Sequence, residues 1–156
     1  MTAQRQRVVA ITGASGGLAQ AIIKLLPQDD IVLAVGRNQE KMAKLYADRP
    51  NFHSYGLNSR DDQALAQLVD QVYKEFGRID VFINNAGFGE FKAFDTFNAP
   101  SIRETFDVNT LAAINFSRLV GERMAVAGSG HIINIASMAG TVSYTHLRAH
   151  ETELHL

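Results

Sequence analysis

A glycine-rich segment near the N-terminus has the residue types of a turn that binds phosphate. The segment TGASGGLA, residues 12–19, lies between an apolar run and the start of a helical pattern. Glycines allow the chain to turn tightly, and they let backbone N–H groups at the N-terminus of a helix approach a pyrophosphate. Many glycine-rich turns bind nothing, so the interpretation needs support from other positions. The residues that we expect to contact a dinucleotide here are Thr12, Gly13, Ser15, Gly16, Gly17 and Leu18.

The residues after the second apolar run bear on which dinucleotide would bind. In dinucleotide-binding folds, an acidic residue about 20 residues beyond the glycines holds the ribose 2′-hydroxyl of NAD, whereas an arginine accommodates the 2′-phosphate of NADP. The sequence there is Val35-Gly36-Arg37, which has an arginine and no acid. It favours NADP, with NAD as an open alternative. The alternative to a phosphate contact is that Arg37 is a solvated loop arginine.

A second turn of small residues, Asn84-Asn85-Ala86-Gly87, follows the fourth apolar run. At the carboxyl end of a strand, such a turn leaves backbone and amide groups facing a ligand crevice. We assign Asn85, Ala86 and Gly87 to the cofactor site. In isolation, the same sequence could be an ordinary turn.

Together the two turns resemble motifs of the short-chain dehydrogenase/reductase family. Residues 12–19 resemble T-G-x-x-x-G-x-G, with Ala19 in place of the last glycine, and residues 84–87 match N-N-A-G letter for letter. Residues 57–59 resemble the stretch after the family's third strand, with Asn58 replacing an aspartate. The resemblance implies that Asn58 presents a carbonyl and an amide, but no charge, to the adenine.

The resemblance also implies two catalytic residues. Asp107-Val108-Asn109 resembles the family's helix asparagine, so we expect Asn109 to support a water in a proton relay. Residues 130–140 resemble the family's fifth strand, which ends in a catalytic serine, here Ser137. A hydroxyl at the end of a parallel strand lies where ligands bind, and it can donate to a substrate carbonyl. The alternatives are a helix-surface asparagine and a serine that caps the strand end.

The family's remaining catalytic pair, Tyr-x-x-x-Lys, is missing at its expected distance after Ser137. The positions where the pair is expected hold His150 and Leu154. Tyr144 and Arg148 have the right mutual spacing but come too early in the sequence. We therefore assign no role to them.

The sequence changes character after Thr141. Residues 142–156 hold three of the five histidines and continue neither the strand nor the helix pattern. Residues 142–152 resemble one reading frame of a transposase adapter used in DNA library preparation, and the alternative is a genuine exposed tail. His146 and His150 have the spacing of metal ligands on a helix, but in this segment they predict no metal site. We divide the chain into an incomplete NAD(P)-binding domain, residues 1–141, and a tail foreign to the fold.

The rest of the chain alternates short apolar runs with longer amphipathic ones, as parallel α/β sheets do. We predict strands at 8–11, 31–35, 52–55, 79–83 and 132–135, and helices at 18–26, 39–47, 61–76 and 102–126. The near-continuous apolar character of most strands indicates burial on both faces. The predicted fold class is therefore α/β with a parallel sheet, and the family resemblance implies a doubly wound, Rossmann-like sheet of order 3-2-1-4-5, truncated after the fifth strand. This fold places strand ends, and with them Ser137 and the two turns, at the edge where ligands bind.

Composition and charge narrow the functional classes. The formal charge of −1 over 156 residues gives no reason to expect nucleic acid or an anionic membrane as a partner. The absence of cysteine excludes disulfides and thiolate metal sites. No apolar run approaches the roughly 20 residues needed to span a bilayer, and the polar residues 1–7 do not resemble a signal peptide. We therefore expect a cytoplasmic location.

The resemblance implies an NAD(P)-dependent oxidoreductase that transfers a hydride between NADP(H) and a small-molecule carbonyl or alcohol. Of the family's catalytic residues, only Asn109 and Ser137 are present, so we expect the chain itself to be inactive. Two alternatives stay open: a non-catalytic NADP-binding sensor on the same fold, and an inert truncated fragment. The resemblance also implies that the full-length protein forms a homo-oligomer.

Overall fold

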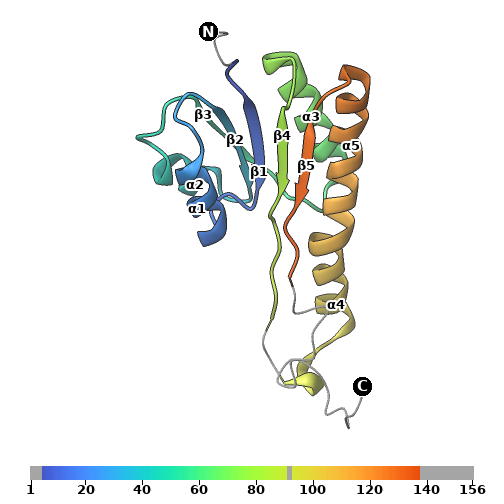
Figure 1. Cartoon of the computed structure of the whole chain (residues 1–156). Coiled ribbons are helices and arrows are strands. Elements are labelled where there is room, and N and C mark those ends of the chain that lie inside the picture. The colour runs from blue at the N-terminus through green and yellow to red at the C-terminus, as the bar shows by residue number, and fades with distance from the viewer. Residues whose placement is uncertain (1–4, 91–92, 138–156) are drawn as a thin grey trace, which may run out of the picture.

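The computed structural model describes residues 5–90 and 93–137, and within them the strands form one parallel sheet (Figure 1). Their order is β3-β2-β1-β4-β5, which confirms the predicted order and fold class. The chain runs outward from β1 on one side and resumes beside it at β4, the place where doubly wound sheets open a ligand crevice. The strands are β1 (Val8–Thr12), β2 (Ile31–Gly36), β3 (Phe52–Gly56), β4 (Val81–Asn84) and β5 (His131–Asn134).

Helices cover both faces of this sheet, with α1 and α2 on one face and α3 and α5 on the other (Figure 1). Successive residues of a strand point to opposite faces. Val8 and Ala10 of β1 therefore pack toward α3 and α5, while Val9 and Ile11 pack toward α1 and α2. This burial on both sides explains the continuous apolar runs. The helices are α1 (Gly17–Leu25), α2 (Gln39–Leu45), α3 (Asp62–Phe76), α4 (Ala99–Phe106) and α5 (Ala112–Ala127), with a short 3₁₀ turn, η1 (Phe94–Thr96), before α4.

The helix predicted at 102–126 differs from the structure in two ways. Helical structure begins earlier, because the side chain of Asn98 caps the N-terminus of α4. A π-helical turn, η2 (Asp107–Leu111), also separates α4 from α5. Such turns are rare and occur frequently at functional sites. The π turn carries Asn109, one of the two predicted catalytic residues.

The last two strands are shorter than predicted or shifted. β4 begins at Val81, although Ile79 before it is buried in the core. β5 ends at Asn134, and it is the outer strand of the described sheet, with β4 on its one paired side. Ile133 and Ile135 are 45% and 42% exposed, so this edge is much less buried than the centre of the sheet.

Candidate functional site

The glycine-rich turn and the N-N-A-G turn lie side by side at the carboxyl ends of β1 and β4. The backbone N–H groups of Asn85 and Ala86 both donate to Thr12 Oγ1, at 3.0 and 2.9 Å. In return, Asn85 Nδ2 donates to the carbonyl oxygen of Thr12 at 3.0 Å. Thr12 is buried, so water competes little for these bonds. The side chains of Thr12 and Asn85, predicted to contact the cofactor, therefore hold the two turns together.

Gly13 allows the two turns to approach this closely. Its φ of +65° lies in the left-handed region, which favours glycine. A Cβ atom at this position would lie 2.8 Å from Ala86 Cα, so no other residue fits without moving the backbone. Gly17, in the same motif, has open space where a Cβ would stand. The close approach of the two turns therefore requires glycine at position 13 but not at position 17.

The N-terminus of α1 offers free groups to an anion. Its N-cap residue, Gly16, provides no side chain to bond the first N–H groups, and no acidic residue lies in the first turn. Backbone N–H groups and the helix dipole favour a negative group at such an end. Gly16, Gly17 and Leu18 are exposed, and all three line a cavity. This arrangement fits the pyrophosphate of a dinucleotide.

Tyr46 supports the glycine-rich turn from the side of α2. Its hydroxyl donates to the carbonyl oxygen of Ala14 at 2.6 Å. Burial raises the pKa of Tyr46, so the hydroxyl keeps its proton at neutral pH. The backbone N–H of Ala14 in turn donates to the carbonyl of Val35 at 3.2 Å. Sequence reasoning missed Tyr46, because no motif marks a tyrosine that follows α2.

A cavity of about 900 Å³ extends from the glycine-rich turn across the carboxyl end of β2, and we call it the adenosine-side cavity. It brings together Ser15, Arg37 and Asn58, all predicted to bind the cofactor. Asn58 Oδ1 accepts a hydrogen bond from the backbone N–H of Arg60 at 3.2 Å. The Arg60 side chain pairs with Glu104 at 3.6 Å. Arg37 is exposed and has no ion-pair partner within the described part of the chain.

A second cavity, of about 910 Å³, is lined by Gly87, Asn109 and Ser137, and we call it the catalytic-side cavity. Asn109 Oδ1 accepts from the backbone N–H of Phe88 at 2.9 Å, and Asn109 Nδ2 donates to the carbonyl of Phe88 at 2.7 Å. The Asn109 side chain therefore fixes the loop after the N-N-A-G turn to the π turn. Gly87 also lines the adenosine-side cavity, so the two cavities adjoin at this turn.

A polar cluster behind the catalytic-side cavity escaped sequence reasoning. Asn84 Nδ2 lies 2.8 Å from Ser117 Oγ, 2.9 Å from Asn134 Oδ1 and 3.1 Å from the carbonyl oxygen of Ala113. Asn84 is buried, and these contacts join β4, β5 and α5. Asn84, Ser117 and Asn134 all line the cavity. The available signal was an amide side chain at the end of each of two neighbouring apolar strands.

Comparison with known proteins identifies the family of this chain. The family model of the short chain dehydrogenases matches residues 7–151. The chain belongs to the short-chain dehydrogenase family. Members of this family are oxidoreductases that use NAD(P), and the match confirms the resemblance seen in the motifs. The matched residues extend beyond Thr141 into the tail.

Two curated relatives show how much of a short-chain dehydrogenase is present. The ketoacyl reductase HetN of Nostoc sp. is 35% identical over 145 residues, which cover 90% of this chain and 50% of that protein. The D-threitol dehydrogenase of Mycolicibacterium smegmatis is 30% identical over 142 residues, which cover 88% of this chain and 55% of that protein. The chain therefore spans about half the length of the curated relatives it matches.

Solved structures show the same fold. A short-chain dehydrogenase from Streptomyces avermitilis has a TM-score of 0.82 at 28% identity, covering 89% of this chain and 52% of its own. ElxO with NADP bound has a TM-score of 0.81 at 25% identity, and the match covers 90% of this chain and 59% of that chain. NAD⁺-bound xylitol dehydrogenase has a TM-score of 0.79 at 27% identity, and the match covers 86% of this chain and 54% of that chain. Structures similar to this chain therefore include both nucleotides.

Other predictions concern parts of the chain beyond these cavities. Within residues 5–90 and 93–137, no helix is long and apolar enough to cross a membrane. In the same ranges, no three His, Asp or Glu side chains gather as metal ligands would. Tyr144, His150 and Leu154, and the domain boundary at Thr141, lie outside the described residues.

Proposed function

We propose that this chain is the NADP-binding half of a dehydrogenase that transfers a hydride between NADP(H) and a small carbonyl or alcohol compound. The observation that carries the NADP preference is Arg37, which is exposed at the adenosine-side cavity without an ion-pair partner among the described residues. A guanidinium suits a phosphate in charge and in hydrogen-bond geometry. No acid stands at the end of β2 to hold a ribose 2′-hydroxyl. NAD is the alternative cofactor.

The cofactor supplies the hydride when it is bound, and the protein binds and orients it. The first-turn N–H groups of Gly17 and Leu18 would hold the pyrophosphate. Asn58 would face the adenine from the adenosine-side cavity. On the catalytic side, Ser137 would donate a hydrogen bond to the substrate carbonyl. Asn109 would support a proton-relay water while its side chain holds the loop at Phe88.

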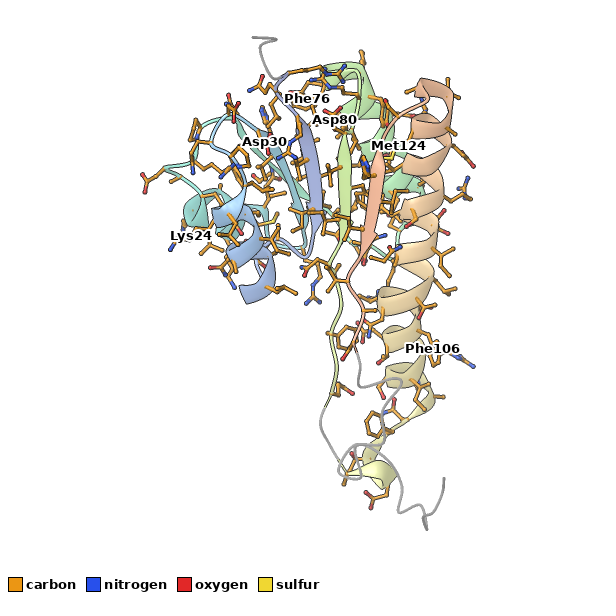
Figure 2. All side chains as sticks on the ribbon, in the orientation of Figure 1. Lys24, Asp30, Phe76, Asp80, Phe106 and Met124 are labelled. Atoms are coloured by element: carbon orange, nitrogen blue, oxygen red, sulfur yellow. The ribbon has the colours of Figure 1, made fainter. Side chains whose placement is uncertain are left out.

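The assembly and location of the full-length protein are also proposals. We propose a homo-oligomer, because α4 and the π turn present Ile102, Phe106 and Leu111 as exposed apolar side chains. Phe106 points away from the sheet, with 60% of its surface exposed (Figure 2). A cytoplasmic location and the division of the chain at residue 141 stay predictions from the sequence.

The NADP preference is tested by replacing Arg37 with alanine in the 156-residue chain. The affinity for NADP should fall by roughly tenfold to a hundredfold, because a hydrogen bond to a charged group contributes about 1.5–3 kcal/mol. The affinity for NAD should change little, since NAD has no 2′-phosphate. Isothermal titration with each nucleotide measures both values.

Arg118→Ala is the matched control, because Arg118 is an exposed arginine that pairs with Glu122 and lines neither cavity. It should leave both affinities unchanged. Equal affinity of the unchanged chain for the two nucleotides would contradict the assignment. An equal loss of affinity for NADP and for NAD in the Arg37 variant would also contradict it.

A further inference from the structure

Met42 occupies the space in which a side chain at position 36 would begin. A Cβ atom at Gly36 would lie 3.0 Å from Met42 Sδ and 3.5 Å from Met42 Cε. The first distance is tighter than nine in ten contacts of real Cβ atoms. Gly36 is an ordinary strand residue without a positive φ, so the contact, not the backbone conformation, disfavours a side chain there.

The contact is relieved only if Gly36 or Met42 moves by a few tenths of an ångström, and both have fixed neighbours. The carbonyl of Gly36 accepts from the backbone N–H of Leu57 at 2.9 Å, and Gly36 is paired with Gly56 of β3. Met42 is fully buried in the core cluster that also contains Ala14 and Ile23. Protein interiors are close-packed, so a displaced thioether must displace its neighbours as well.

An acid at position 36 would therefore meet two obstacles. Its Cβ would press on the Met42 thioether, and its carboxylate would start next to an apolar cluster, where an unpaired charge is costly. Position 36 is the last residue of β2, the region where an acid would hold the ribose 2′-hydroxyl of NAD. The contact with Met42 thus bears on the choice of cofactor.

We propose that Met42 is a positioning residue for cofactor selectivity. Its thioether reserves position 36 for glycine, excludes the acid that would favour NAD, and leaves the 2′ group of the cofactor to Arg37. This inference rests on the proposed NADP preference. It explains how a side chain that lines neither cavity influences what binds there.

The test compares three variants of the 156-residue chain by isothermal titration with NAD and with NADP. Gly36→Asp alone should weaken NADP binding on the order of tenfold, by repulsion of the 2′-phosphate, and should not strengthen NAD binding. Gly36→Asp with Met42→Ala should bind NAD on the order of tenfold more tightly than Gly36→Asp alone, the effect of one hydrogen bond from the ribose to a carboxylate. Gly36→Asp with Met124→Ala is the control, because Met124 is equally a buried methionine but packs in the opposite core cluster on α5 (Figure 2). This control should give no gain in NAD affinity over Gly36→Asp alone.

A second measurement separates the contact from nucleotide binding. Gly36→Ala should lower the Tm when Met42 is present and lower it much less in a Met42→Ala background, because contacting residues are coupled. Additive changes in Tm would overturn the proposal. A gain in NAD affinity from Gly36→Asp alone, as large as that of the double variant, would overturn it too. Equal affinity of the unchanged chain for NAD and NADP would refute the NADP preference instead, and coupling in the Tm values distinguishes that failure from a failure at Met42.

Discussion

The two sides of the cleft hold their functional groups in different ways. On the cofactor side, Thr12 is only 5% exposed, and its hydroxyl bonds the backbone of Asn85 and Ala86. On the catalytic side, Asn109 and Ser137 are both exposed. Asn109 is bonded to the backbone of a loop rather than to a strand end in the core. The groups that join the two turns are therefore held inside the fold, whereas the two predicted catalytic residues lie at its surface.

The position of each side in the sheet explains the difference. In the part of the chain that the structure describes, β1 and β4 each have a neighbouring strand on both sides, whereas β5 is paired with β4 alone. Buried groups with fixed partners keep their distances, and catalysis needs reacting groups near about 3 Å. Among the described residues, the two turns are therefore well braced, while the predicted catalytic residues Asn109 and Ser137 lie in exposed positions. The predictions below test this contrast.

The largest expected effect is the absence of turnover despite cofactor binding. A positioned general acid typically contributes roughly 10²–10⁴-fold to a rate. The positions where the family's tyrosine and lysine are expected hold His150 and Leu154 instead. Because the two turns are braced, the 156-residue chain should bind NADPH, which is measured as a change in the fluorescence of NADPH. It should show no substrate-dependent loss of NADPH absorbance with a panel of ketones and aldehydes.

Ser137→Ala provides the control for this experiment. If the chain has no working catalytic side, the variant and the unchanged chain will give the same background rate. Substrate-dependent oxidation that disappears in the variant would show that a complete site exists in this chain. Failure to bind NADPH at all would favour the inert-fragment alternative.

Some features of the molecule could be predicted from the sequence because they depend on residues that are close together in the chain. The glycine-rich turn and the N-N-A-G turn are runs of adjacent residues, so both motifs could be recognised in a single sequence. The α/β fold class was likewise predictable from the alternation of apolar runs and amphipathic helices, and the strand order was implied by the resemblance to the family. The motifs and the fold class depend on local spacing, which a single sequence contains.

Features that depend on contacts between distant residues were not predictable. Thr12 and Asn85 are 73 positions apart, and nothing in either motif says that their side chains bond the other turn. The link between Asn84 and Asn134 spans 50 positions. The π turn at Asn109 leaves no mark in the periodicity of the predicted helix. Met42 looks like any core methionine of an amphipathic helix until its contact with Gly36 is seen.

A smaller effect is expected when the brace between the two turns is strained. Gly13→Ala places a side chain at a left-handed φ and against the backbone of Ala86. A strained backbone and an overpacked contact each cost about 1–3 kcal/mol, so the free energy of unfolding should fall by about 2–6 kcal/mol. Urea titration at pH 7 measures it.

Gly17→Ala is the matched control, since it lies in the same motif and its Cβ would meet nothing within 4 Å. It stands in the first turn of α1, where alanine is a better helix former than glycine, so stability should stay equal or rise by up to about 1 kcal/mol. Equal losses in the two variants would mean that the close approach of the turns is not what requires Gly13.

The smallest effect concerns acid, and it arises at the opposite end of the sheet. Asp80 lies just before β4, at the amino edge, away from the cleft (Figure 2). Burial acts to raise the pKa of this carboxyl, but its hydrogen bonds with Val8 N at 2.8 Å and Arg78 at 2.9 Å, together with the charge of Arg5, lower the pKa overall below its ordinary value. The side chains that brace the cleft, those of Thr12, Asn85 and Asn109, carry no titrating group in this range.

A lowered carboxyl pKa means that the unfolded chain takes up its proton first as the pH falls. Asp80 therefore contributes stability that is fully present above the unfolded value and is lost as the pH falls through the folded value. Asp80→Asn should lower the free energy of unfolding at pH 7 by about 1 kcal/mol or less, because the pairs are partly exposed. It should also flatten the decline of that free energy below about pH 4, measured by urea titration at several pH values. Asp48→Asn, which removes an exposed carboxylate elsewhere, should change neither quantity. An unchanged slope in the Asp80 variant would place the acid-sensitive groups in another part of the chain, away from the amino edge of the sheet.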